Sequence, residues 1–407
     1  MHNYDSNNWY PMYREVDTSQ MLNFETDSGD ITKIDYFIVI VVVCISGNPI
    51  IVNGTQWYGV IAVFIMLMVC LVFRRTLINI LFIKWLVGFI FLFALQGIIL
   101  SEISIPAEIN FISKLYVIFL AVSFLGTKFR SAYFNVMYII SVISLVCFGL
   151  NYLGINIGWQ FEKYRTIFIY NNLIRFEKAH IFRNCGMFWE PGAFQGYIML
   201  GFLFFINDYK SLWKIYRWKC IILSLALLTT FSTTGYIVYL LYIAYIISTS
   251  YINHYIKAFL VFLVLICCIY AYYNFDFLGK KIERQYENAM NLRSNEVSWS
   301  RMGAMKIDFQ QILRHPLVGN GFVMSSRYEK LGNKMAGAGN GFTGAINMLG
   351  VPCIAIYLMA LYRSLNFNSK KQNIFFISLI VILLNGEFFL NYPLFWGLPF
   401  ITLSDKN

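Results

Sequence analysis

Apolar segments of about 17 to 22 residues recur along the chain from Ile34 to Leu403, separated by shorter polar segments. An α-helix of about 20 apolar residues is long enough to cross the hydrocarbon core of a bilayer. The segments lack the alternation of apolar and polar residues that transmembrane barrel strands require. The pattern therefore predicts an all-α polytopic membrane protein.

About twelve transmembrane helices are expected, within a range of roughly 10 to 13, because several segments are short or interrupted. We place them at approximately 34–51, 56–73, 79–100, 111–127, 133–154, 191–207, 219–232, 234–250, 257–274, 341–362, 373–387 and 391–404. The interruptions lie at Gly47-Asn48-Pro49 and at Ser232-Thr233-Thr234-Gly235. Residues 34–404 then form one transmembrane domain.

Basic residues gather on one side of these spans, and the positive-inside rule assigns that side to the cytoplasm. They are Arg74, Arg75, Lys128, Arg130, Lys210, Lys214, Arg217, Lys219, Arg363, Lys370 and Lys371. The loop 101–110 on the opposite side carries Glu102 and Glu108 but no Lys or Arg. Two long polar loops, 155–190 and 275–340, are therefore expected at the outer face of the membrane.

Residues 1–33 form an acidic, Asn-rich tail, which the orientation places in the cytoplasm. The tail has neither an apolar run nor a cleavage-site pattern, so we expect no signal peptide there. Its composition is typical of disordered segments.

Composition narrows the class further. A chain with 58% hydrophobic and only 13% charged residues is not an ordinary soluble globule. Its net charge of +11 fits membrane topology and attraction to lipid headgroups, so no nucleic-acid partner is expected. Six of the eight cysteines fall within predicted spans, which argues against a disulfide framework. No paired Cys/His spacing and no Asp-x-Asp pair occurs in an outer loop, so we expect neither a metal nor another cofactor.

The segment Arg183–Ala193 combines an arginine, the carboxylate of Glu190 and the turn Pro191-Gly192 where a polar loop enters a membrane helix. Charged residues held at a membrane surface suggest a functional site unless they only pair with each other. The simpler alternative is a snorkelling arginine beside a glutamate. Pro191 in the first helical turn would direct free backbone N–H groups at the outer surface.

Both outer loops carry further structure. Residues 164–176 fit either a surface helix or a hairpin turning at Asn171-Asn172. In the second loop we expect a helix from about Ser300 to Leu313, ended by His315-Pro316. Such loops suit an anionic, lipid-tethered substrate, because arginine binds a diphosphate through two parallel hydrogen bonds. One carboxylate or histidine would then suffice to deprotonate an attacking hydroxyl.

The chain resembles the bacterial Wzy-type polymerases of O-antigen, capsule and exopolysaccharide repeat units, which are related to the O-antigen ligases. The resemblance lies in Arg183-x-x-Gly-x-Phe-Trp-Glu-Pro-Gly192 opening a helix, in Ser232-Thr-Thr-Gly235, and in the order Arg301, His315-Pro-Leu-Val-Gly-Asn-Gly321, Gly339-Asn340-Gly341 and Leu349-Gly-Val351. It covers about 180–365 in motifs and the whole chain in topology.

The resemblance implies a GT-C-like glycosyltransferase of the bacterial inner membrane that needs no metal and inverts the anomeric carbon. It would transfer a growing glycan from undecaprenyl diphosphate to another lipid-linked repeat unit, alongside a flippase and a chain-length regulator as partners. Arg183 and Arg301 would bind the donor diphosphate. Arg175 joins them because Arg175 and Gly186 reproduce an Arg-x10-Gly spacing described for some members.

Where many relatives have His-Asn before the helix near 341, this chain has Gly339-Asn340, which favours a polymerase over a ligase. The general base is therefore open, with Glu190 as the first candidate and His315 as the second, although His315 could simply close a helix. Trp189, Asn340 and Ser232 are candidate substrate-binding residues, and Ser232 could instead only pack helices. For Glu387 the sequence leaves open whether it pairs with a loop arginine or contacts substrate.

Two other functions compete with the polymerase. A ligase would transfer the glycan to a different acceptor, such as lipid A core. A transporter of lipid-linked oligosaccharides should show internal repeats and charges near mid-membrane, whereas here the two halves differ and the charges gather in the outer loops.

Overall fold

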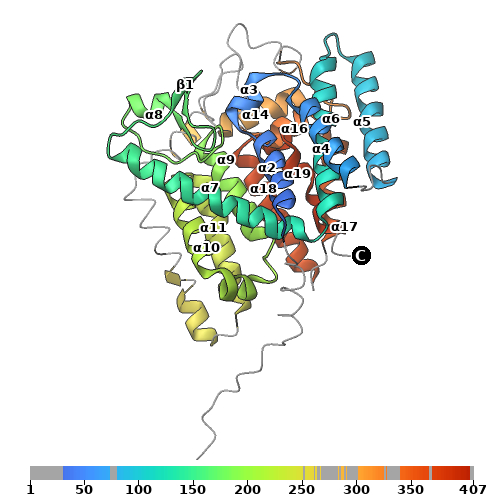
Figure 1. The fold of residues 1–407 in the computed structure, drawn as a ribbon. Coiled ribbons are helices and arrows are strands. Elements are labelled where there is room, and N and C mark those ends of the chain that lie inside the picture. The colour runs from blue at the N-terminus through green and yellow to red at the C-terminus, as the bar shows by residue number, and fades with distance from the viewer. Residues whose placement is uncertain are drawn as a thin grey trace, which may run out of the picture.

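The computed structural model describes residues 31–73, 80–250, 253–260, 301–324, 340–365 and 369–403, with a few single positions between 262 and 327. Most of the tail 1–33, of the span expected at 257–274 and of the outer loop 275–340 lies outside the described residues. The described chain is mainly helical, as the sequence predicts, with one small sheet at the end of the molecule that also carries α3 and α14 (Figure 1).

Among the described residues, six helices precede the sheet. They are α2 (Lys33–Ile45), α3 (Pro49–Gly54), α4 (Tyr58–Val72), α5 (Ile80–Ile99), α6 (Ile105–Leu125) and α7 (Lys128–Tyr152). The break between α2 and α3 falls at the predicted interruption, where the Asn48 side chain accepts a hydrogen bond from the N–H of Ile50 and caps α3. Asn48 also donates to the Phe168 carbonyl, which fixes this break to the first outer loop.

The first outer loop folds into a three-stranded antiparallel sheet, β1 (Trp159–Phe161), β2 (Tyr164–Thr166) and β3 (Asn171–Leu173), followed by α8 (Ile174–Lys178). In the register of this sheet, Arg165 lies opposite Gln160 on one side and Asn172 on the other. The segment 164–176 therefore contains both strand and helix. A hairpin turn at Asn171-Asn172 is wrong, because both residues lie in β3 and the connection precedes them.

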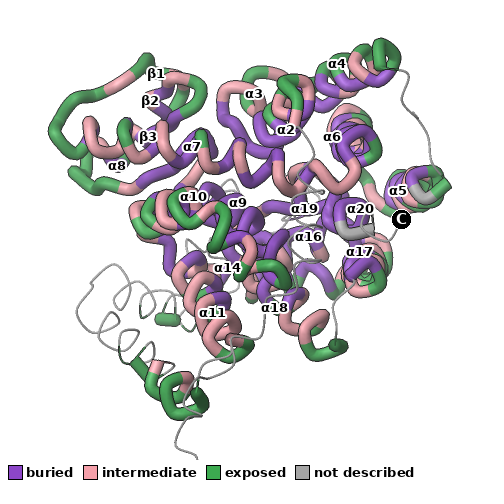
Figure 2. Tube along the Cα trace, turned by 60° about the horizontal axis from the view of Figure 1, so that its bottom comes forward, coloured by how far each residue is buried: buried purple, intermediate pink, exposed green. Residues whose placement is uncertain are grey.

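Helix α9 (Pro191–Leu203) forms the centre of the molecule. All of its residues are buried, and it contacts α7, α10 (Tyr209–Thr229), α11 (Thr233–Thr249) and α18 (Lys370–Gly386). In Figure 2 it lies among these helices as a buried element. Its glycines permit close packing, since a Cβ on Gly196 would lie 2.1 Å from the ring of Phe389.

The last part of the chain contains α14 (Arg301–Ile312), α16 (Gly341–Leu349), α17 (Val351–Ser364), α18, the 3-10 helix η1 (Phe389–Asn391), α19 (Pro393–Trp396) and α20 (Leu398–Leu403). The helix expected from about Ser300 to Leu313 is confirmed as α14. A single straight span at 341–362 is wrong, because α16 and α17 meet at an angle of 118°. Gly350 makes this bend with a φ of 82°, and the backbone of Leu317 and Gly319 packs against it.

The last predicted span, 391–404, is also not one continuous helix. Pro393 starts the short helix α19, and Gly397 separates it from α20. A proline has no N–H with which to continue the helix before it, so the chain restarts there.

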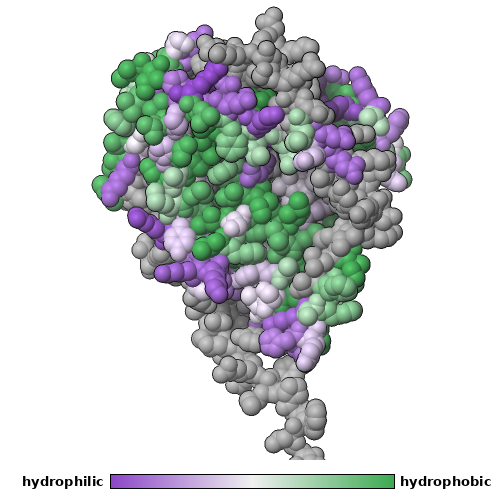
Figure 3. All heavy atoms as spheres, turned by 180° about the vertical axis from the view of Figure 1, so that it is seen from behind, coloured by the Kyte–Doolittle hydropathy of each residue, from purple (hydrophilic) through white to green (hydrophobic). Residues whose placement is uncertain are grey.

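Three described helices are long and apolar enough to cross a membrane: Phe82–Ile99, Ile105–Leu125 and Lys128–Tyr152. A fourth is gained if the bent pair α16 and α17 counts as one span, and α4 and α11 are shorter apolar helices. Seen from behind, the surface is hydrophobic across its middle, with hydrophilic residues above and below (Figure 3). The described helices thus support a membrane protein, while the number of twelve spans stays a prediction.

Candidate anion-binding site

The segment that begins at Arg183 is fixed by its neighbour Asn184. The Asn184 amide donates to the hydroxyls of Ser144 and Thr229, at 3.1 and 3.0 Å, and its oxygen accepts the N–H of Gly186. The Gly186 carbonyl in turn accepts the N–H of Asn171 in β3 at 2.7 Å. These bonds attach the segment to α7, α10 and the sheet, so its side chains have defined positions.

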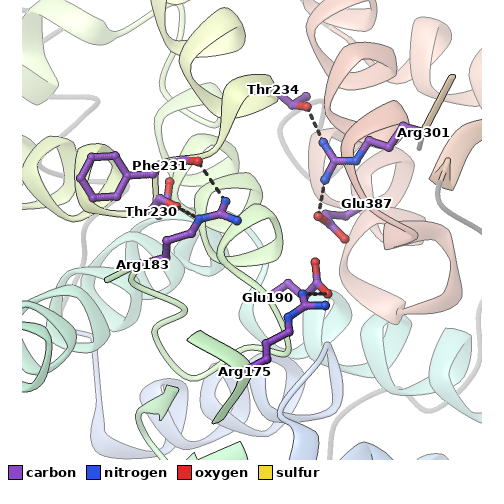
Figure 4. Close-up of polar contacts among 8 residues, drawn as sticks. All are labelled: Arg175, Arg183, Glu190, Thr230, Phe231, Thr234, Arg301 and Glu387. Carbon is purple, nitrogen blue, oxygen red and sulfur yellow. Dashed lines mark hydrogen bonds and ion pairs between the residues drawn. The ribbon is translucent and has the colours of Figure 1, made fainter. Parts of the chain in front are cut away.

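Arg183 is held by the short connection between α10 and α11, and Arg301 by the first turn of α11. The Arg183 guanidinium donates to the carbonyl oxygens of Thr230 and Phe231, at 3.1 and 2.9 Å. Arg301 donates to the Thr234 hydroxyl at 2.9 Å. The two arginines that the sequence assigns to one site therefore lie on either side of the same turn (Figure 4).

The turn itself has an unusual backbone. Phe231 has a φ of 46°, in the left-handed region that residues other than glycine seldom adopt. This conformation lets two successive carbonyls, those of Thr230 and Phe231, face one guanidinium. Strained backbone of this kind tends to occur at functional sites.

Two glutamates complete the charged cluster. Glu387 pairs with Arg301 at 2.6 Å, and these side chains are only 11% and 24% exposed. Glu190 pairs with Arg175 at 3.0 Å, and this pair is more open. A Cβ on Gly192 would lie 2.1 Å from a carboxylate oxygen of Glu387, so Glu387 rests directly on the first turn of α9. Figure 4 shows the charged ends of all five side chains turned toward a common space.

Two helix N-termini also face this cluster. Helix α9 starts after Glu190 and α11 after Ser232, and neither residue caps its helix through its side chain. The first backbone N–H groups of a helix carry partial positive charge and attract anions. Three arginines and two uncapped N-termini around two glutamates make this a site suited to a multiply charged anion.

Trp189 directly precedes Glu190. Its ring stacks on Tyr392 with centroids 4.6 Å apart and lies against Gly47 in the break between α2 and α3. A Cβ on Gly47 would lie 2.1 Å from the indole, so any larger residue there would displace Trp189. The interruption of the first span therefore makes room for this ring, whose exposed part could stack on a sugar.

Asn340 and Ser232 lie close to the cluster but are nearly covered, at 5% and 2% exposure. The Asn340 side chain caps α16 by accepting the N–H groups of Phe342 and Thr343. Gly341 packs on the Glu387 carbonyl, which places the start of α16 beside the ion pair of Arg301 and Glu387. Both candidate substrate-binding residues are thus near the site, and in this structure the Asn340 side chain acts as a helix cap.

His315 is not brought to the cluster. It follows the far end of α14, and the first and last residues of that helix, Arg301 and Ile312, are about 16 Å apart at 1.5 Å per residue. The His315 carbonyl accepts the N–H of Gly319 in the turn that packs on the bend at Gly350. Of the two residues proposed as base, only Glu190 lies among the arginines.

Lys114, a buried cation, was not among the residues expected from the sequence. This residue of α6 is 4% exposed, and its ammonium donates to the Tyr58 hydroxyl at 3.2 Å and to the Asn391 carbonyl. It also lies 5.8 Å from the ring of Tyr392, the residue on which Trp189 stacks. Among the described residues no carboxylate pairs with it. A lone charge in the apolar segment 111–127 was the signal that could have identified it.

Burial affects two titrating groups of the Arg183 segment. It lowers the pKa of Arg183 from its ordinary value, but a guanidinium remains protonated at neutral pH. It raises the pKa of Cys185 to about 12, so this thiol is not ionised at neutral pH and is a poor nucleophile.

In the part of the chain that the structure describes, no three His, Cys, Asp or Glu side chains gather as a metal site would need. Comparisons with protein-family models, with curated proteins and with solved structures gave no match for this chain.

Proposed function

We propose that this chain is a GT-C-like glycosyltransferase with about twelve membrane spans that polymerises undecaprenyl-diphosphate-linked oligosaccharide repeat units at the outer face of a bacterial cytoplasmic membrane. The observation that carries the proposal is the convergence of Arg183, Arg301 and Arg175 on one space with two uncapped helix N-termini. A diphosphate is the anion whose charge and oxygen count fit this arrangement.

In the proposed reaction the phosphates displace carboxylates from their arginines. Among the described residues Arg183 donates to carbonyls and pairs with no carboxylate, so it contacts phosphate first. Arg301 follows once phosphate has displaced Glu387 from it. The bond between the donor's anomeric carbon and its phosphate oxygen breaks, and its electrons remain on the diphosphate. Arginines stabilise this charge as it develops, so the reaction is expected to proceed without a metal.

The acceptor hydroxyl attacks the anomeric carbon from the opposite face, which inverts it, and its proton passes to a carboxylate. We assign this role to Glu190, because its side chain is 34% exposed and is reachable for an incoming sugar. Glu387 is more deeply covered and is better placed to orient Arg301. Trp189 beside Glu190 then supports the acceptor sugar through its ring.

The test is polymerisation of a purified lipid-linked repeat unit by the reconstituted full-length protein. Arg183→Ala should leave single repeat units in place of long chains. Arg165→Ala is the matched control, because Arg165 belongs to the same outer loop but pairs with Glu177 in the sheet region. An unchanged chain-length distribution for Arg183→Ala would count against the proposal.

The same reconstitution separates the competing functions. Transfer of the glycan only to a different lipid acceptor would indicate a ligase. Transbilayer movement of the labelled substrate without formation of a glycosidic bond would indicate a transporter. Addition of a chelator should leave the rate of polymerisation unchanged. If the chelator abolished polymerisation and added magnesium restored it, the reaction would require a metal, contrary to the proposal.

A further inference from the structure

A groove lies between α10 and α11 at the end of the molecule far from the arginines. Helix α10 reaches the site at its last residues, and its first residue, Tyr209, is about 30 Å away at 1.5 Å per residue. The groove has a volume of about 450 Å³, within the usual range for sites that bind small molecules. It is lined by Phe202, Leu212, Trp213, Cys220, Tyr239 and Tyr242.

The inner part of this groove is mainly apolar. The ring of Phe202 packs against Tyr242 with centroids 5.6 Å apart. Nearby, the Tyr239 hydroxyl donates to the Ser224 hydroxyl at 2.7 Å, which satisfies these polar groups within the protein. The interior therefore offers mainly aromatic and aliphatic surface to an occupant.

The mouth of the groove is different. Lys210 lines it with an exposed ammonium, and the hydroxyl of the neighbouring Tyr209 is buried without a hydrogen-bond partner among the described residues. A buried hydroxyl without a partner is costly, which points to a polar group supplied from outside the chain. The Lys210 ammonium lies 5.8 Å from the centre of the Tyr209 ring. An ammonium close to a tyrosine with an unpartnered hydroxyl is suited to an oxygen-rich anion.

The first part of α10 has the composition of a segment at the membrane interface. The helix is kinked at Tyr216, which has the non-helical angles φ −121° and ψ 30°. The residues before and just after the kink include Lys214 and the largely exposed Trp213 and Trp218. Lysine and tryptophan together are typical of segments that lie at the lipid headgroups.

We propose that this groove binds one anionic phospholipid from the adjacent leaflet. One acyl chain occupies the apolar interior beside Trp213 and Tyr242, and the phosphate accepts hydrogen bonds from Lys210 and Tyr209. A zwitterionic lipid fits the interior equally well but gains less from Lys210. This site is independent of the glycosyl transfer proposed above, and its occupancy does not depend on that activity.

The experiment measures quenching of Trp213 fluorescence by lipids with brominated acyl chains in vesicles that hold the full-length protein. The protein has nine tryptophans. Subtracting the emission spectrum of the Trp213→Phe variant from that of the wild type leaves the emission of Trp213. We expect brominated phosphatidylglycerol to quench at about fivefold lower mole fraction than brominated phosphatidylcholine, the preference that one lysine near an anionic lipid provides. Lys210→Gln should abolish this preference, whereas Tyr209→Phe should weaken quenching by both lipids alike, because both carry a phosphate that can accept the tyrosine's hydrogen bond.

Lys33→Gln is the matched control. Lys33 starts α2, whose other end approaches Trp189, so it lies at the same end of the molecule as Lys210 but outside the groove. Its preference should equal that of the wild type. Equal quenching by both lipids in the wild type, or a preference that survives Lys210→Gln, would overturn the proposal. A loss as large in Lys33→Gln would also overturn it, because general surface charge would then explain the binding.

Discussion

Arg183 and Arg301 lie on either side of one turn, yet their charges are balanced in different ways. Arg183 donates to two neutral carbonyls, and among the described residues no carboxylate pairs with it. Arg301 forms a short, mostly covered ion pair with Glu387. The site therefore has one arginine that can bind an anion directly and a second that can do so only after the anion has displaced Glu387.

The largest expected effect comes from replacing Arg183 or Arg301 with lysine, which has a single ammonium in place of the planar guanidinium. A lysine at 183 cannot reach two carbonyls and a phosphate together, so Arg183→Lys should lower the rate of repeat-unit coupling about 100-fold. Arg301→Lys can still pair with Glu387, so its rate of repeat-unit coupling should fall only about tenfold. Coupling rates of the two purified variants give the measurement, and equal losses would remove the distinction between the two arginines.

The next test removes the competing carboxylates. Glu387→Gln removes the negative charge that pairs with Arg301. The protein should therefore bind undecaprenyl diphosphate about fivefold more tightly at low salt. Glu190→Gln should change this affinity less than twofold, because the Arg175 side chain of its pair is 63% exposed and solvent weakens the interaction. Equilibrium binding of the labelled lipid measures both, and weaker binding by Glu387→Gln would show that Glu387 supports the anion instead of competing with it.

A glycine substitution can disturb the ion pair of Arg301 and Glu387 without changing either of these residues. A Cβ at position 192 would overlap the Glu387 carboxylate, so Gly192→Ala should displace it and reduce coupling about tenfold. Gly201→Ala lies in the same helix with its nearest neighbours at 3.7 and 3.8 Å, which is ordinary contact, and should leave the coupling rate unchanged. Similar rates for Gly192→Ala and Gly201→Ala would mean that the position of Glu387 has no influence on the reaction.

The smallest expected effect is on stability, and it distinguishes the capped N-terminus of α16 from the uncapped N-terminus of α11. Asn340→Ala removes two hydrogen bonds that cap α16 and should lower the free energy of unfolding by about 1 kcal/mol. Ser232 makes no side-chain cap on α11, so Ser232→Ala should leave stability nearly unchanged. Thermal unfolding of the two variants in detergent checks this, and a comparable loss in Ser232→Ala would show that the start of α11 is not open to a ligand.

Local signals predicted several elements well. The break at Gly47-Asn48-Pro49, the helix boundary at Ser232 and helix α14 all follow from residues next to each other in the chain. The bend at Gly350 could not be predicted in this way, because it depends on a distant turn whose Leu317 and Gly319 backbone packs against it. For residues 164–176 the sequence left a helix and a hairpin open, and the structure contains strands and a short helix, with Asn171 and Asn172 inside a strand instead of at the turn.

The candidate site was predicted in the same uneven manner. Arg183 and Glu190 could be named because they share one segment, and Arg301 because its motif resembles that of a family. The pairing of Arg301 with Glu387 joins residues 86 positions apart, and no local pattern encodes it. His315 was named for its residue type, but the length of α14 separates it from the arginines.

Helix α9 starts at the candidate site, and all its residues are buried by other parts of the protein. Helices that face lipid tilt when the bilayer becomes thicker or thinner, whereas a helix enclosed by protein does not sense that change directly. Vesicles made from shorter or longer acyl chains should therefore change the tilt of the outer helices more than the position of Glu190. An organism could alter its fatty acids with temperature and keep this end of the helix in place.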